Sequence, residues 1–353
     1  MTKLQRVGQT ADGMARQPRI EYEGAYYHVM CRGDRQEPIC EDDRDRQMFL
    51  KTFDEGCARS GWRLYGWVLM SNHYHWVLRT PQANLVAGMK WFQNTYTRRL
   101  NTRHGKWGHV FGGRYKAVVV QSSEERGGDY LCSLIDYVHL NPVRAGLVRL
   151  EEGMGLLDYP WSSLTRGYAV VPGQRETWMA AREGLELFGY ADRAKGRRDF
   201  VRRLERRALE KFEGDALSDR GLQNTLRRGW YWGSQEFRER LLARVKHPQG
   251  NRNHGKGDRQ KAEKWLARGR QHFKIAGLLQ DAARQERIAL AWALHRRTNQ
   301  SQKWIAETLG LCSAANVSQQ VRRFERDIVQ GSDPLLKLAA PLRKWLSMVK
   351  NCD

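Results

Sequence analysis

Two apolar segments separated by only two polar residues constrain the fold of this chain more than any other feature. Residues 62–70 read WRLYGWVLM and residues 73–80 read HYHWVLRT, and both are rich in aromatic and β-branched residues. Ser71 and Asn72 between them leave room only for a tight turn. The pair therefore predicts an antiparallel β-hairpin at the centre of this part of the chain.

Strand-like and helix-like patterns alternate around this hairpin. Apolar residues at helical spacing, after a capping Asp42 or Asp43, predict the first helix. In chain order we expect a strand at 24–33, a helix from about residue 42, the hairpin, a helix at 84–105, a strand at 114–121 and a helix from 129 that ends or bends at Pro142. The order β-α-β-β-α-β-α predicts an α+β fold, a ferredoxin-like antiparallel sheet with helices on one face.

The second half of the chain has a different composition, mostly helical in pattern and dense in arginine. Within it, KHPQGNRNHGKGDRQ is polar, basic and rich in glycine, which is typical of a linker. The predicted organisation is a flexible arm at 1–20, the sheet domain at 21–165, a mostly α-helical extension at 166–245, a basic linker at 246–260 and a helical domain at 261–353.

The net charge of +22 predicts a polyanionic partner, and nucleic acid is the commonest one. A generally basic surface without a specific partner is the alternative interpretation. The chain begins without an apolar secretory segment, and no stretch approaches the roughly 18 apolar residues that a membrane span needs. We therefore expect no membrane partner and a cytoplasmic, nucleoid-associated location.

The second hairpin strand carries two histidines. His73 and His75 lie two residues apart, so their imidazoles share one face of the sheet, while Tyr74 and Trp76 point to the opposite, core face. Two neutral imidazoles suit a divalent transition metal, and with an oxygen ligand they suit Mg²⁺ or Mn²⁺. Taken alone, this pattern is more often a pair of ordinary strand histidines.

A tyrosine and an asparagine on the third predicted helix strengthen the metal hypothesis. Tyr137 and Asn141 are four residues apart, a spacing that places both on one helix face. The amide oxygen is a hard ligand for Mg²⁺ or Mn²⁺, and the phenol is a potential nucleophile. Because Pro142 follows Asn141, the argument requires the last turn to stay helical up to Asn141. The alternative is a core helix in which Tyr137 only packs.

Four motifs in fixed order carry a family resemblance. LMSNHYHWVLRTP, GHVFGGRYKAVVV, YVHLNPVRAGLV and YPWSSL follow one another between residues 18 and 165. Together they resemble the single-tyrosine HUH transposases, and in particular the branch associated with repetitive extragenic palindromes (REP). The resemblance implies that His73, His75 and Asn141 bind Mg²⁺ or Mn²⁺ and that Tyr137 is the catalytic nucleophile. Asparagine rather than glutamine at position 141 favours the REP-associated branch.

The implied activity is metal-dependent transposition of single-stranded DNA at hairpins. Attack by Tyr137 would leave a 5′-phosphotyrosine and a free 3′-hydroxyl, and a second 3′-hydroxyl would reverse the step. One alternative is a domesticated DNA-binding protein that recognises repeat hairpins and has lost its chemistry. A histidine-metal hydrolase of small phosphoesters is a more distant one. Either a monomer or a homodimer could form the site.

Two further regions are candidates for contacting DNA. Aromatic and basic residues of the second helix and the loop after it could supply stacking surfaces and a basic groove for a single strand. The candidates are Trp91, Phe92, Arg98, Arg99, Arg103, Lys106, Trp107, Arg114 and Lys116. Residues 301–328 have a helix-turn-helix pattern that would direct Arg322 and Arg323 to duplex DNA, although an ordinary helical hairpin explains the same pattern.

Overall fold

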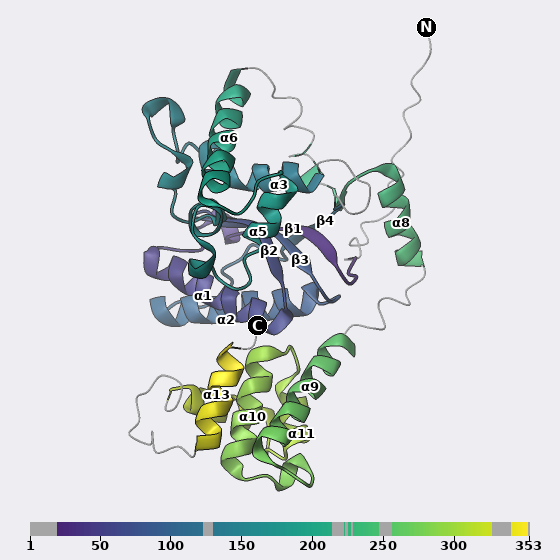
Figure 1. Ribbon diagram of the computed structural model, residues 1–353. Coiled ribbons are helices and arrows are strands. Elements are labelled where there is room, and N and C mark those ends of the chain that lie inside the picture. The colour runs from purple at the N-terminus through teal and green to yellow at the C-terminus, as the bar shows by residue number, and fades with distance from the viewer. Residues whose placement is uncertain are drawn as a thin grey trace, which may run out of the picture.

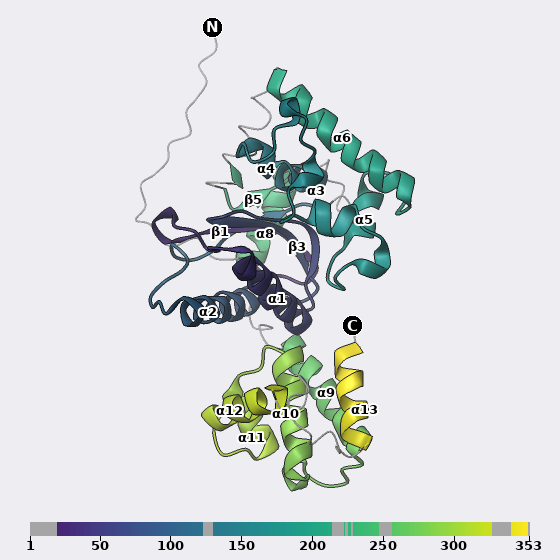
Figure 2. The ribbon, with the colours of Figure 1, turned by 90° about the vertical axis from the view of Figure 1, so that its left-hand side faces the viewer.

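The chain folds into two bodies, a mixed α/β domain and a smaller helical domain (Figures 1 and 2). The computed structural model describes residues 20–122, 130–213, 222, 225–226, 229–246, 256–326 and 340–351. Each body has its own apolar core, one reaching from Ala25 to Leu241 and the other from Ala262 to Val349. None of the helices in the described ranges is long and apolar enough to cross a membrane.

A sheet forms the centre of the first domain. Its main strands are β1 (Ala25–Arg32), β2 (Arg63–Leu69), β3 (His73–Thr80) and β4 (Lys116–Val120). They lie in the order β2-β3-β1-β4, and every neighbouring pair is antiparallel. The predicted hairpin is formed by β2 and β3, and the predicted ferredoxin-like α+β class is confirmed.

Helices α1 (Asp43–Ser60) and α2 (Leu85–His104) lie side by side along one face of this sheet (Figure 2). Asp42 caps α1 as expected, because its side chain accepts a hydrogen bond from the amide of Asp45. The predicted core face of β3 packs here, with Trp76 buried against Phe53 and Phe92. Aromatic packing thus fixes the two helices to the sheet.

The opposite face of the sheet is covered by α3 (Tyr130–His139), so helices are not confined to one face. The reason is that β3 is apolar on both sides, since Val77 on the histidine face is fully buried too. On the same face, Val138 of α3 is fully buried as well. The position of α3 brings a helix over the two histidines.

The predicted helical extension is not purely helical. It contains α5 (Ala181–Leu187), α6 (Ala194–Glu213), α8 (Gln235–Lys246) and a short strand, β5 (Tyr231–Trp232). β5 pairs in parallel with β4, through bonds from the Val119 and Gln121 amides to the Trp230 and Trp232 carbonyls. Its aromatic residues favour a strand, and pairing covers an edge of β4 that would otherwise be exposed.

Short helical turns connect the longer elements. They are η1 (Asp34–Gln36), α4 (Asn141–Arg144), η3 (Leu150–Glu152), η4 (Leu156–Asp158), the π-helical turn η5 (Leu164–Tyr168), η6 (Pro172–Gln174) and η8 (Leu279–Asp281). Of these, α4 and η1 flank the candidate site.

The second domain is helical. Its helices are α9 (Lys256–Phe273), α10 (Arg284–Arg297), α11 (Gln302–Leu309), α12 (Ala314–Phe324) and α13 (Ala340–Asn351). The last five residues of the predicted linker therefore already belong to α9, whereas residues 247–255, like the first 19 residues of the predicted arm, lie outside the described ranges. Lys261 docks this domain on α1 by donating from Nζ to the carbonyls of Ala58 and Arg59, at 3.2 and 2.9 Å.

Candidate active site

The two histidines and the tyrosine helix meet at one pocket on the α3 face of the sheet. The pocket has a volume of about 300 Å³ and is lined by Met30, Arg32, Met70, His73, His75, Tyr137, Asn141, Arg144, Ala145 and Leu226. All four residues predicted to form the site therefore line one cavity within a single chain. Among the described residues, the lining contains two arginines and no carboxylate.

The imidazoles of His73 and His75 are oriented by neighbouring side chains. His75 Nδ1 lies 2.9 Å from His28 Nε2, and His73 Nδ1 lies 2.7 Å from the Asn72 side-chain oxygen. The ring centroid of His75 is 5.1 Å from that of His73 and 5.8 Å from that of Tyr137. Because these bonds use Nδ1 of both rings, the Nε2 atoms are the ones that could bind a cation.

Both histidines are neutral at physiological pH. Burial, together with the positive charge of Arg32, lowers the pKa of His73 to about 4. Burial lowers the pKa of His75 well below its usual value, and neighbouring His28 acts in the same direction. Each ring therefore keeps the unprotonated nitrogen that a metal ligand requires.

The backbone changes direction between Tyr137 and Asn141, yet the two side chains stay together. α3 ends at His139, Leu140 adopts φ −89° and ψ 1°, and Asn141 begins α4. Pro142 is tolerated there because the first turn of a helix needs no amide donor at that position. Asn141 Nδ2 donates to the Tyr137 carbonyl over 2.9 Å, which holds the amide against the preceding turn.

The donor set fits a small divalent cation. Asn141 uses its amide nitrogen on the Tyr137 carbonyl, so Oδ1 is the atom that could bind a metal beside the two imidazoles. A pair of neutral imidazoles with an amide oxygen is compatible with Mg²⁺ or Mn²⁺. Within the described part of the chain, no cluster of three or more His, Cys, Asp or Glu side chains could hold a metal ion.

Two arginines that the sequence analysis did not select lie at the pocket. Arg144 Nη1 donates to the Tyr137 carbonyl over 2.7 Å, and its guanidinium carbon lies 4.5 Å from the centre of the Tyr137 ring. Arg32 is exposed and lies directly across from His73 in the β1–β3 pairing. Helical periodicity does not indicate Arg144, because the helix is interrupted at Leu140 between Tyr137 and Arg144.

Several predicted DNA contacts are engaged in intramolecular interactions instead. Trp91 is half-buried with the Arg59 guanidinium 4.8 Å from its ring centre. The engaged cations are Arg99 with Glu55, Arg103 with Asp42 and Asp45, and Lys106 with Glu41. Phe92 is fully buried in the core and cannot contact DNA. Arg98, Arg114, Arg322 and Arg323 are exposed, and Lys116 is half-buried on β4 opposite Met30.

The YPWSSL motif connects α3, the helix that carries Tyr137, to the sheet. Ser163 Oγ lies 2.7 Å from His139 Nε2 on α3, donates to the Trp67 carbonyl on β2 and accepts from the Trp67 amide. This serine therefore connects α3 with the sheet. The motif is visible in the sequence, but its contact with α3 follows only from the fold.

Comparison with known proteins gives one family match. Residues 21–131 match the family model described as "Transposase IS200 like", a range that contains His73 and His75 and ends before Tyr137. No curated protein matches the chain. A solved structure described as a REP-associated tyrosine transposase bound to a REP hairpin aligns with a TM-score of 0.37 and 16% identity, covering 46% of this chain and 88% of that one.

The fold and the pocket together define a ferredoxin-like domain with a histidine pair on the sheet and a tyrosine on the facing helix. Within this class, the segment that contains β1 to β4 is similar to the IS200-like transposases. The family resemblance predicted from the motifs is therefore confirmed for residues 21–131.

Proposed function

We propose that this protein is a metal-dependent DNA strand transferase that cleaves and rejoins single-stranded DNA beside hairpins. The observation that carries the proposal is that His73, His75, Tyr137 and Asn141 line one pocket of one chain. The match of residues 21–131 to the IS200-like transposases supports the same reaction class.

In the proposed reaction, the phenol oxygen of Tyr137 attacks the phosphorus of a DNA phosphodiester. The new bond is a 5′-phosphotyrosine, the bond to the 3′-oxygen breaks, and that oxygen leaves as a hydroxyl. His73, His75 and Asn141 would hold Mg²⁺ or Mn²⁺, which acts as a Lewis acid on the phosphate. Arg32 and Arg144 add positive charge where the phosphate charge increases.

The proposed substrate is a single strand that carries a REP-like hairpin. Arg32 and Arg144 in the pocket lining and the net charge of +22 both favour a polyanion. Because one chain supplies all four residues, we propose that a monomer is sufficient and that the site works in cis. Such a substrate would place the protein on chromosomal DNA.

We also propose that the second domain binds duplex DNA through α11 and α12. Ser301 and Ser313 cap these two helices, and Gly310 ends α11 in a left-handed conformation, as in a helix-turn-helix. Ile305, Val317 and Val321 are buried between them, while Arg322 is exposed on α12. The exposed face of α12 would then lie in the major groove.

Adduct formation tests the catalytic proposal. Wild-type protein is incubated with a labelled hairpin oligonucleotide and Mn²⁺ or Mg²⁺, and a denaturant-stable protein–DNA adduct is expected. Tyr137→Phe should give no adduct while still binding the oligonucleotide. If the wild type yields no adduct with a wide range of hairpins, the alternative is favoured, a domesticated DNA-binding protein without catalysis. If Tyr137→Phe still yields one, the nucleophile is a different residue.

Duplex binding tests the second domain separately. Replacing Arg322 and Arg323 by alanine should weaken binding to duplex DNA. The slope of log affinity against log salt concentration should fall by about one unit per arginine, because each arginine would lose one phosphate contact. Adduct formation on a short single strand should be unchanged. Unaltered duplex affinity in the double variant would refute a DNA-binding role for α12.

A further inference from the structure

Trp107 is the most exposed large apolar side chain in the described part of the chain. Its relative exposure is 93%, against 64% for Leu278, the next in rank. An indole loses favourable burial at such a position, so exposed aromatic side chains often mark binding surfaces. Trp107 lies in the loop between α2 and β4, outside the pocket lining.

The turn that carries Trp107 has a defined conformation. Gly105 and Gly108 adopt φ values of 62° and 100°, which glycine reaches without strain. The Lys106 amide donates to the Asn101 carbonyl over 2.9 Å, and Asn101 Nδ2 donates to the Gly108 carbonyl over 3.0 Å. The end of α2 therefore holds the chain on both sides of the indole.

The same loop is attached to the strand that enters the pocket. The Gly112 amide donates to the Arg32 carbonyl, and the Asp34 amide donates to the Val110 carbonyl, both over 3.0 Å. Gly33 and Phe111 form a β-bridge between these two bonds. The loop therefore continues directly into the pocket rim, where Arg32 is located.

Positive charge connects the loop with the pocket. Arg32 lines the pocket, is exposed and forms no ion pair with any described residue. Arg114, at the other end of the loop, is also exposed. Arg32 at the pocket and Arg114 at the end of the loop are both positively charged, which favours a polyanionic strand running between them.

We propose that Trp107 is a stacking platform for an unpaired base of the single strand that occupies the pocket. This inference rests on the proposed function, because it requires a DNA phosphate in the pocket. The base must be unpaired, since both of its faces are covered inside a duplex. Trp91 cannot take this role, because it is half-buried and the Arg59 guanidinium lies over its ring.

Binding measurements test the platform without requiring catalysis. The probe is fluorescein-labelled oligo-dT, which has no hairpin, and the protein carries Tyr137→Phe so that no adduct forms. Trp107→Ala should weaken binding about 5-fold to 100-fold, the range of a single base–aromatic stack. Trp107→Phe should keep most of the affinity, and Trp107→Leu, which is apolar but cannot stack, should lose it.

Two controls isolate stacking from charge and folding. Leu278→Ala removes the next most exposed apolar side chain and should leave binding unchanged. An oligonucleotide with abasic residues in place of thymidine should have the same affinity for the protein with Trp107 and for Trp107→Ala. Melting temperatures of the Trp107 variants should match, because the side chain is almost fully exposed.

Two results would overturn the proposal. One is that Trp107→Ala binds oligo-dT as tightly as the protein with Trp107. The other is that Trp107→Ala weakens binding of the abasic strand as much as it weakens binding of oligo-dT. If the proposed strand transfer does not occur, the measurements give a different pattern. In that case wild-type protein forms no adduct with hairpin DNA, while oligo-dT binding still depends on Trp107.

Discussion

Asp136, the residue directly before Tyr137, is 1% exposed and accepts hydrogen bonds from Arg203 at 2.7 and 3.0 Å. Arg207 contacts the same carboxylate. Both arginines belong to α6, which lies outside the range matched by the transposase family model. The extension therefore fixes the helix that carries the candidate nucleophile.

Replacing Asp136 with asparagine should destabilise the protein by about 2 kcal/mol, because it leaves two guanidinium groups without their carboxylate. This loss of stability is smaller than that for breaking a fully buried ion pair, because both arginines are partly exposed. Urea denaturation measures the change. Arg206→Ala, on the exposed side of the same helix, is the matched control and should have little effect. Equal stability of Asp136→Asn and wild type would contradict the assigned role of α6.

His28 should determine how well His75 binds a cation. His28 is fully buried, and its Nε2 lies 2.9 Å from His75 Nδ1, so it fixes the orientation of that ring. Removing such a partner typically lowers metal affinity 10- to 100-fold. We expect His28→Phe to show this loss in calorimetric titration with Mn²⁺, while the exposed His109→Phe binds like wild type. If His28→Phe binds Mn²⁺ as tightly as wild type, His28 does not orient His75 for metal binding.

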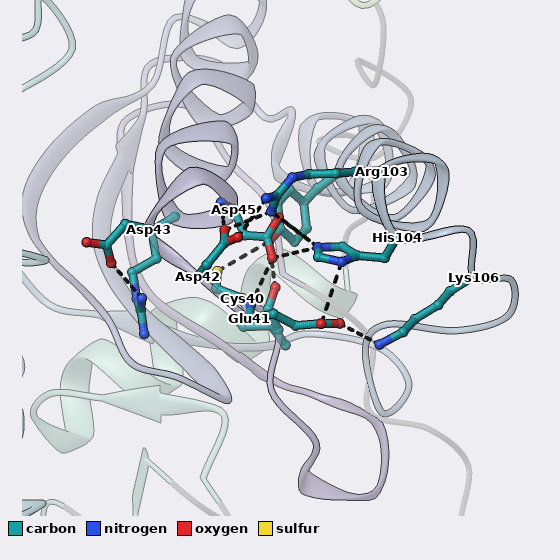
Figure 3. Close-up of polar contacts among 11 residues, drawn as sticks. Cys40, Glu41, Asp42, Asp43, Asp45, Arg103, His104 and Lys106 are labelled. Carbon is teal, nitrogen blue, oxygen red and sulfur yellow. Dashed lines mark hydrogen bonds and ion pairs between the residues drawn. The ribbon is translucent and has the colours of Figure 1, made fainter.

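A charged cluster fastens the start of α1 to the end of α2 (Figure 3). Asp45 is fully buried and accepts hydrogen bonds from the Glu41 amide, Arg103 and His104. Replacing Asp45 with asparagine should cost about 3 kcal/mol, because these donors lose a charged acceptor. Chemical denaturation measures the loss. The exposed Asp43→Asn is the matched control and should cost far less.

The same cluster should make stability depend on pH. Burial alone would raise the pKa of Asp45, but the bonds from Glu41, Arg103 and His104 outweigh it and lower the pKa below the usual 3.8. A carboxyl with a lowered folded-state pKa stabilises the fold above its unfolded pKa and loses that contribution as pH falls toward the folded value. Below about pH 4, wild type should therefore lose stability more steeply than Asp45→Asn. Parallel slopes of the two proteins would contradict this.

The contact between the two domains should depend on Lys261. Its ammonium group donates to the last carbonyls of α1, where a helix end favours a positive charge. Lys261→Met keeps the side-chain length without the donors, so the second domain should separate more often from the first. Limited proteolysis between the domains should then become faster, while Lys264→Met, which is exposed on the same helix, should match wild type. Identical cleavage rates in both variants would show that other contacts hold the domains together.

Several local features of the first domain were predictable from the order of residues alone. The hairpin follows from two strand-like segments separated by two residues, and the shared face of His73 and His75 from their two-residue spacing. The Asp42 cap involves an amide only three residues further along the chain. The four ordered motifs resemble the single-tyrosine transposases, and the family model agrees with this resemblance over residues 21–131.

The contacts between groups that are distant in sequence depend on the three-dimensional fold. It placed Tyr137 of α3 over His75, paired β5 with β4, and added Arg144 to the pocket. It also engaged Arg103 with buried Asp45, although the sequence presents that arginine as a candidate DNA contact. The physical reason is that side-chain periodicity is local, whereas charge pairing and burial depend on the packing of segments that are far apart in sequence.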